Sequence, residues 1–399
     1  MIADGRHPTK GGAKASGRRL WKRLALAGVA LAALAAFGLI GWNLLTRYFV
    51  DKYYQDSYQP IPLSASAVGL PPAEHHLTDV PWLSTRESYC AANALRMIAA
   101  QRGREASVGE VNFLMGFTYG AAEVPGKVGI AAYTDPEPGH VFAAPYLGLV
   151  RRYYVADDAS LYLKALRAEI SRGRPVRVPL DFAVLYSLPG QMPHSDLLVG
   201  YDSAGFYYYE TVCTEGAPCQ VSELPPGERG LYASDQLLLS AVIAQARGFS
   251  YPWRYAYTVF EPAAAQDDLH EVFRRNGQAL VGGSQYGPKQ GADAVEAFAA
   301  SVERLGEGLP VGEVLSGLES AAYTRRDDAA YLRSRFVGDP EISRAGELLD
   351  RAGAAYGQVR AALSAGRAEH DQAAQLAGWL REAAAAEREA GQILLRRGS

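Results

Sequence analysis

Three side chains of this 399-residue chain, Cys90, His194 and Glu210, are of the types that together turn a thiol into a nucleophile. A thiolate attacks a carbonyl carbon, a histidine takes and returns the thiol proton, and an acid fixes the tautomer and orientation of that histidine. Each residue also has a simpler interpretation: Cys90 as a small packed side chain, His194 as a loop histidine and Glu210 as a solvated strand end. The chemical interpretation requires that the fold bring the three together.

The sequence around Cys90 predicts that its thiol lies at the start of a helix. Pro81 disfavours the α conformation in the residue before it, so the segment begins extended. From Tyr89 onward, apolar residues recur at helical spacing, which places Cys90 in the first turn. The unpaired backbone N–H groups and the helix dipole at that position favour a thiolate over a thiol.

His194 and Glu210 are predicted to lie on the two strands of one hairpin, because runs rich in β-forming residues flank the turn Asp202–Gly205. A turn centred on Asp202 places His194 opposite Glu210, and we favour this register. A turn centred one and a half residues further on places His194 opposite Cys213 instead. It also turns Glu210 to the other face of the hairpin, because strand side chains alternate.

The rest of the chain divides by composition. Residues 79–261 mix helical and strand patterns and predict an α+β domain; within them, the Gly- and Pro-rich stretch 116–142 predicts a loop and 175–181 a strand. From 262 to 399, Ala, Glu, Arg and Leu recur at helical spacing, which predicts an all-helical C-terminal domain. This helical domain is a candidate surface for a protein partner.

Residues 81–95 resemble the nucleophile segment of the bacteriocin-processing (C39-type) cysteine peptidases. Residues 173–180 are similar to their strand of a small residue, Pro and a β-branched run, and 194–210 to their histidine hairpin, including the sixteen residues from histidine to acid. The resemblance implies a papain-like fold, an antiparallel sheet packed on helices. It also implies that Cys90 is the nucleophile, that His194 is the general base and then acid, and that Glu210 orients it.

A second resemblance is to the butirosin biosynthesis protein H family, which pairs a C39-like domain with a helical C-terminal domain. Residues 178–181, the tyrosine-containing loop before His194, and residues 323–332 in the helical part are similar to it. This resemblance implies an acyltransferase that moves an acyl group from a carrier protein to an amine. The same three side chains would act, with an amine instead of water as the acceptor.

The sequence departs from the C39 pattern beside the nucleophile. Ser84 stands six residues before the cysteine, where these peptidases have a glutamine that donates to the oxyanion, and Ala91 replaces a glycine. Glu210-Thr211 stands where the peptidases have Asp-Pro. The loss of one oxyanion donor costs roughly 10²–10³ in rate. Ser84 and Arg86 are the candidate replacements, together with the backbone N–H of Cys90.

These observations lead to three hypotheses about function. The first is a cysteine hydrolase that cleaves a peptide or amide through Cys90, His194 and Glu210. The second is the acyltransferase with the same triad. The third is a catalytically inactive domain that binds a peptide or another ligand in the same cleft, as the missing glutamine allows.

The N-terminal region predicts a membrane anchor. Residues 1–23 carry seven basic residues and one aspartate, and residues 24–45 form an uncharged Leu/Ala-rich run of 22 residues, long enough to span a bilayer as a helix. Basic flanks stay in the cytoplasm, so the expected topology is a single pass through the plasma membrane. Residues 46–78 would then be a stalk carrying an extracytoplasmic catalytic domain. Secretion after signal-peptide cleavage is the alternative.

The net charge of −3 gives no reason to expect nucleic acid as a partner. Outside the cytoplasm, Cys213 and Cys219 would form a local disulfide and leave Cys90 as the free thiol. We expect no metal and no cofactor, because the sequence has neither ligands at metal-site spacing nor a phosphate-binding glycine loop.

Overall fold

The computed structural model describes residues 38–39, 41–42, 44–85, 87, 89–116, 121–124, 126–131, 136–212, 229–282, 289–365 and 370–399. The chain forms two compact units, residues 1–56 and residues 57–399. In the first unit the described residues are helical. Most of the predicted membrane segment, 24–45, lies outside the described residues. Within the described part of the chain, no helix is both long and apolar enough to cross a membrane.

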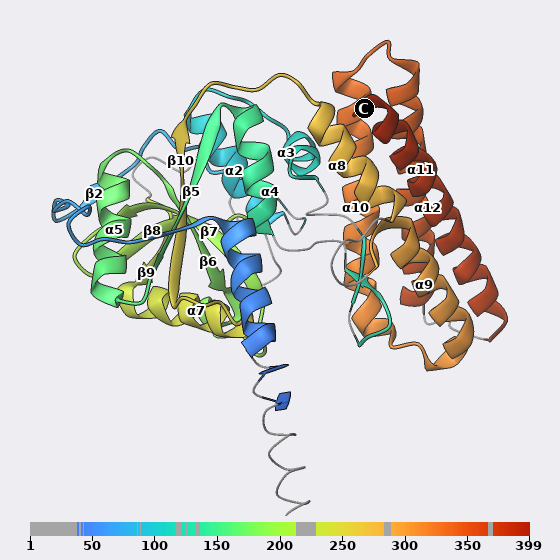
Figure 1. Ribbon diagram of the computed structural model, residues 1–399, viewed down its shortest axis with the longest axis horizontal. Coiled ribbons are helices and arrows are strands. Elements are labelled where there is room, and N and C mark those ends of the chain that lie inside the picture. Colours follow the sequence, from blue (N-terminus) through green and yellow to red (C-terminus); the bar gives the residue numbers. More distant parts are fainter. Residues whose placement is uncertain are drawn as a thin grey trace, which may run out of the picture. The chain divides into compact units, whose positions relative to one another are not determined.

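The second unit begins with an α+β part, as the sequence predicts (Figure 1). Its sheet has eight strands and is mixed, whereas the expected sheet was antiparallel. The order is β1-β5-β10-β6-β7-β8-β9, with β2 paired to β7; the β1–β5 pair is parallel and the others are antiparallel. The strands are β1 (Pro60–Pro62), β2 (His75–His76), β5 (Leu149–Ala156), β6 (Val176–Asp181), β7 (Pro193–Tyr201), β8 (Gly205–Tyr209), β9 (Leu231–Ser234) and β10 (Tyr255–Pro262).

Helices pack around this sheet: α2 contacts β7, α5 contacts β7 and β10, and α7 contacts β6 and β10. Side-chain caps begin four of the helices, because Ser107, Asp158, Asp181 and Ser234 each accept a hydrogen bond from a first-turn N–H group. The helices of this part are α2 (Cys90–Gln101), α3 (Val108–Leu114), α4 (Pro136–Ala143), α5 (Ala159–Ser171), α6 (Phe182–Leu185) and α7 (Asp235–Gly248), with a 3-10 turn, η2 (Ala144–Leu147).

The prediction of a loop over residues 116–142 is wrong in part. A short two-stranded sheet joins β3 (Ala122–Glu123) to β4 (Ile130–Ala131), and α4 begins at Pro136. Proline is tolerated in the first turn of a helix, where its missing N–H group would have no partner within the helix. The two prolines at the start of α4 therefore begin this helix, although their type suggested a loop.

The C-terminal part is all helical, as predicted. Helix α12 packs against α8, α9 and α11, and α10 packs against α11. Inside, the buried Glu387 carboxylate accepts hydrogen bonds from Arg325 at 2.7 Å and from the Tyr356 hydroxyl at 2.8 Å. The helices are α8 (His270–Val281), α9 (Gly291–Leu305), α10 (Val311–Arg335), α11 (Pro340–Ser364) and α12 (His370–Arg397), with a 3-10 turn, η3 (Gly306–Gly308).

Helix α10 joins the helical part to the start of α2 and to α3. The Tyr89 hydroxyl donates to Asp327 at 2.7 Å, and Asn112 donates to Asp328 at the same distance. A Cβ atom at Gly109 would lie 2.8 Å from the Asp327 carbonyl oxygen, so α3 and α10 meet at this glycine. The residue before Cys90, Tyr89, is therefore held by a hydrogen bond to the helical part.

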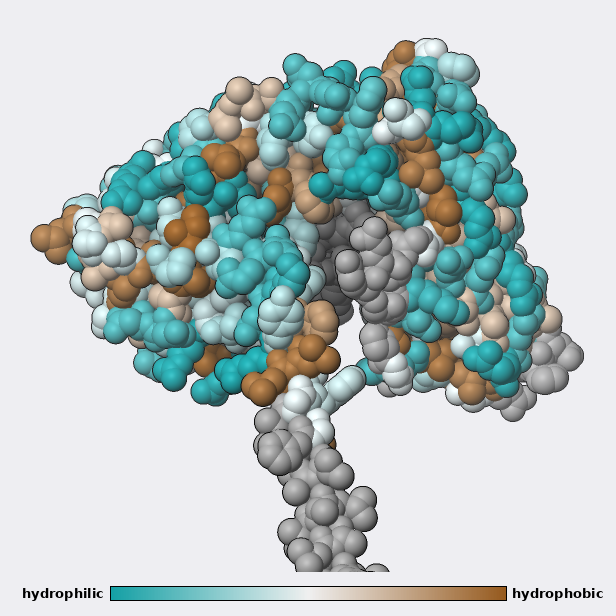
Figure 2. Space-filling model, in the orientation of Figure 1, coloured by the Kyte–Doolittle hydropathy of each residue, from teal (hydrophilic) through white to brown (hydrophobic). Residues whose placement is uncertain are grey.

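On the face drawn in Figure 2, hydrophilic residues predominate and apolar residues are scattered.

Candidate active site

Cys90 is the first residue of α2, as predicted, and its thiol is partly buried. The N-cap residue Tyr89 makes no side-chain cap hydrogen bond, and the dipole at the start of α2 favours a negative charge at Cys90. Asn93, one turn later, donates to the backbone oxygen of Thr211 at 2.8 Å. This bond ties α2 to the end of the hairpin that contains His194.

The register of the hairpin differs from the one we favoured. Next to the turn, Tyr201 pairs with Phe206, which centres the turn between Ser203 and Ala204. A β-bulge then shifts the pairing by one residue, so that Leu198 faces Tyr208.

Beyond the bulge, the continued register puts Glu210 across from Asp196 rather than from His194. His194 and Asp196 lie two residues apart on β7, so all three side chains share one face of the hairpin. The predicted pairing of His194 with Glu210 is therefore wrong. The three side chains nevertheless share one face. The observed turn alone would point Glu210 away from His194, and the extra residue of the bulge turns it back.

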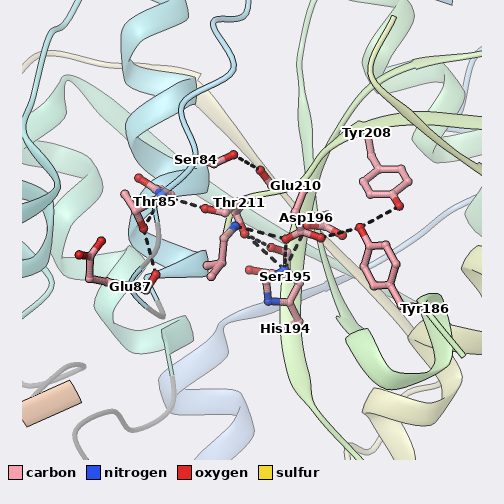
Figure 3. A network of polar contacts seen from close by, with 12 residues as sticks. Ser84, Thr85, Glu87, Tyr186, His194, Ser195, Asp196, Tyr208, Glu210 and Thr211 are labelled. Atoms are coloured by element: carbon pink, nitrogen blue, oxygen red, sulfur yellow. Dashed lines mark hydrogen bonds and ion pairs between the residues drawn. The ribbon is translucent and has the colours of Figure 1, made fainter. Parts of the chain in front are cut away.

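His194 and Glu210 are directly hydrogen bonded: Nε2 of the histidine lies 2.6 Å from Oε1 of the glutamate (Figure 3). The other carboxylate oxygen of Glu210 accepts from the Tyr186 hydroxyl at 2.7 Å, and Tyr208 donates to Tyr186 at 3.1 Å. The backbone N–H of Val212 adds a donor to Oε1 at 3.2 Å. The Glu210 side chain is fully buried, so these contacts fix its orientation and that of the imidazole.

The pKa values of Cys90 and His194 move in opposite directions. Burial raises the pKa of the Cys90 thiol, but the hydrogen bond and charge of His194, the charge of Arg177 and a hydrogen bond with Ser195 outweigh it, and this pKa lies below its usual value. Burial lowers the pKa of His194, but the charges of Glu210 and Asp196 outweigh that effect and raise it well above its usual value. Both shifts favour a thiolate beside an imidazolium at neutral pH. Because Nε2 is bonded to Glu210, Nδ1 is the nitrogen left for the sulfur.

Asp196 is a functional candidate that the sequence analysis missed. Its Oδ1 lies 3.2 Å from His194 Nε2, the nitrogen that also contacts Glu210, and the side chain is fully buried. Burial and then the charge of Glu210 raise the pKa of Asp196 to about 7. The signal was present in the sequence, since a residue two positions after a strand histidine lies on the same face.

A second missed group is a buried ion cluster near α2. Glu137 of α4 forms ion pairs with Arg177 of β6 and Arg151 of β5, and all three side chains are almost fully buried. Burial raises the pKa of Glu137, but the two arginines outweigh it and hold this pKa well below its usual value. Beside them, His140 contacts the backbone oxygen of Ala91 at 3.0 Å. The cluster therefore contacts α2, and the charge of its Arg177 lowers the pKa of Cys90.

Ser84, one of the predicted oxyanion donors, uses its hydroxyl in a contact with the backbone at Glu210. The Ser84 hydroxyl donates to the backbone oxygen of Glu210 at 2.7 Å, and Trp82 Nε1 donates to the same oxygen at 2.8 Å. Ser84 thus supports the chain at Glu210 (Figure 3). Arg86 lies outside the described residues, as do Cys213 and Cys219 of the predicted disulfide.

The cluster of His194, Asp196 and Glu210 also has the spacing that a metal ion would require. One potential ligand atom from each residue lies within 4.8 Å of the others. We interpret the cluster as one that holds protons, since an imidazolium and one shared proton balance the charge of two carboxylates. The expectation of no metal stays a prediction.

A scan against protein-family models finds no match to this chain, and a search of the curated proteins finds no relative.

Proposed function

We propose that this chain is a papain-like cysteine hydrolase that cleaves a peptide or amide bond through Cys90, His194 and Glu210. The observation that carries the proposal is the 2.6 Å contact between His194 Nε2 and Glu210 Oε1, beside a thiol whose pKa lies below its usual value. A structural histidine needs neither a buried acid at one nitrogen nor a thiol at the other. Nucleophilic catalysis by cysteine needs both.

The reaction would proceed in two halves. The Cys90 thiolate attacks the carbonyl carbon, the C–N bond breaks, and the leaving amine takes a proton from the His194 imidazolium. The neutral imidazole then takes a proton from a water molecule, whose oxygen attacks the thioester carbonyl. The C–S bond breaks, which releases a carboxylic acid and regenerates the thiolate. In both halves the backbone N–H of Cys90, at the start of α2, is the available oxyanion donor.

Glu210 contributes by keeping the imidazole in place through both halves. Its carboxylate is itself oriented by the hydroxyl of Tyr186 and the N–H of Val212. Burial raises the pKa of Glu210, but His194 outweighs it and lowers this pKa below its usual value, so the group remains ionised. An ionised acid stabilises the imidazolium that protonates the leaving amine.

We also propose where the enzyme acts. The basic residues before an uncharged run of 22 residues support a plasma-membrane anchor with the catalytic part outside the cytoplasm. Its substrate would then be an extracytoplasmic peptide or amide. The helical part, which holds Tyr89 beside the nucleophile, is the candidate surface for a protein partner.

Labelling of Cys90 tests the proposal. Iodoacetamide is expected to alkylate Cys90 in the folded protein at pH 6, well below the ordinary thiol pKa of ~8.5, with the modified peptide measured by mass spectrometry. His194→Ala is expected to slow this alkylation by roughly tenfold or more, since a rise of one pKa unit reduces the thiolate fraction about tenfold. If Cys90 reacts no faster than an unperturbed thiol, the proposal is wrong.

An activated ester such as p-nitrophenyl acetate then separates hydrolysis from transfer. A burst of about one nitrophenol per Cys90, followed by steady turnover in water alone, supports a hydrolase. A burst that turns over only when an amine is added supports the acyltransferase hypothesis. No burst from a protein with a reactive Cys90 would contradict both.

A further inference from the structure

Asp196 is the second carboxyl group at a nitrogen that can donate only one hydrogen bond. Glu210 takes that bond at 2.6 Å, while Asp196 Oδ1 lies further away, 3.2 Å from the same Nε2. Within the described part of the chain, neither oxygen of Asp196 has a hydrogen-bond partner, although the side chain is fully buried. A buried ionised carboxylate without a donor is costly, whereas a protonated carboxyl can itself donate.

The surroundings of Asp196 supply one positive charge for two carboxyl groups. His194 and Glu210 face Asp196 directly. The phenols of Tyr186 and Tyr208 are also close: burial raises the pKa of each phenol most, and the charge of Asp196 raises it further. Of these four groups only the imidazole can be a cation. Two adjacent carboxylates do not both ionise easily in such a site, and one retains a proton to higher pH.

We propose that Asp196 is a positioning residue beside His194 and that Asp196 shares one proton with Glu210. A single net negative charge then faces the His194 imidazolium. The inference rests on the proposed function, because it concerns the protonation of the general base. At low pH the Asp196 carboxyl is neutral and has little effect on the thiolate–imidazolium pair. Once it ionises, a second negative charge holds the imidazolium proton more tightly. Asp196 therefore sets the upper pH limit of the ion pair.

Two alkylating reagents separate the charges of the site. Iodoacetamide is neutral and reports the amount of Cys90 thiolate. Iodoacetate is an anion, so its rate rises where the imidazolium is present and falls once the imidazolium loses its proton. The pH profile of iodoacetate alkylation should thus have a lower limb set by the thiolate and an upper limb set by His194. Both profiles are measured on the full chain, from the Cys90 peptide.

Asp196→Asn, which resembles the neutral carboxyl, is expected to leave the lower limb of both profiles unchanged. It should move the upper limb with iodoacetate to lower pH by roughly one to two units, because the second charge can no longer form. Glu210→Gln is the matched variant: it removes the carboxylate that faces the imidazolium already at low pH, so it should move the upper limb to lower pH by more than Asp196→Asn does. A merely structural role of Asp196 would lower the folded fraction without moving either limb.

An infrared measurement on the unmodified protein keeps the inference testable if Asp196→Asn folds poorly. The pH difference spectrum between about pH 6 and pH 8 should contain the loss of a buried carboxylic-acid C=O band that persists in the Asp328→Asn background, because the buried carboxyl of Asp328 titrates in the same range. The inference is overturned if this band is absent, or if Asp196→Asn leaves the upper limb in place. Ordinary thiol reactivity in the unmodified protein would instead overturn the proposed function, and the two failures are therefore distinguishable.

Discussion

Arg177 provides the sharpest test of how the buried ion cluster acts on the nucleophile. Its guanidinium is almost fully buried in an ion pair with Glu137, and its charge lowers the pKa of Cys90 after the effects of burial and of His194. Arg177→Met removes that charge and keeps much of the side-chain volume. The pKa of Cys90 should then rise, because the thiolate loses a nearby positive charge.

Arg151 is the matched control, because its side chain is equally buried and pairs with the same Glu137 carboxylate. Removing either arginine from a buried ion pair should lower the free energy of unfolding by about 3–5 kcal/mol. Loss of stability alone therefore cannot distinguish the two variants. Arg151 is not among the principal contributors to the pKa shift of Cys90, so only the Arg177 variant should change the thiol.

The assay is the rate of iodoacetamide alkylation of Cys90 as a function of pH, with the free energy of unfolding measured by urea titration. A rise of about one unit in the Cys90 pKa would slow alkylation about tenfold at a pH below both pKa values. The two rates should converge at high pH, where both proteins carry the thiolate. Arg177→Lys, which retains the charge, should recover part of the lost rate. Equal pH profiles for Arg177→Met and Arg151→Met would refute the assignment of the charge to Arg177.

Three further predictions concern the surrounding groups. Ser84→Ala should change steady turnover of the activated ester by less than about threefold, since its hydroxyl binds the Glu210 backbone; a loss of roughly 10²-fold would restore it as an oxyanion donor. Burial raises the pKa of Asp328 from 3.8 to about 7, so the folded state keeps a proton that the unfolded state releases, and the free energy of unfolding should fall as pH rises through this range. Asp328→Asn should flatten that slope in urea titrations at several pH values, and an unchanged slope would contradict the assignment. EDTA should leave Cys90 alkylation and its pH profile unchanged, and a response reversed by added zinc would replace the proton-holding interpretation of the His194 cluster with a metal site.

The sequence identified the three central residues because each belongs to a local pattern. Cys90 follows a proline-containing extended segment and opens an amphipathic helix, while His194 and Glu210 flank a turn in a run of β-forming residues. Such patterns depend on neighbours along the chain, so they can be read without knowledge of the fold. The α+β part followed by an all-helical part could be predicted for the same reason.

The missed residues depend on contacts between distant segments. Arg177 stands at a strand position that is buried on both sides, and only the arrival of Glu137 from a stretch predicted to be a loop makes a buried arginine tolerable there. Ser84 has the position of an oxyanion donor in sequence, but the strand end that contains Glu210 competes for its hydroxyl. Neither pairing has a signal within the local sequence.

The bulge in β7 shows why the site required the fold and not the spacing alone. The turn observed between Ser203 and Ala204 would, in a regular hairpin, point Glu210 away from His194. One extra residue in β7 between Leu198 and Gly200 reverses that outcome and also brings Asp196 across from Glu210. The same irregularity therefore completes the triad and creates the pair of carboxyl groups. Deleting Val199 should remove both together: Cys90 alkylation at pH 6 should fall to the rate of an ordinary thiol, and a retained rate would show that the bulge does not position Glu210.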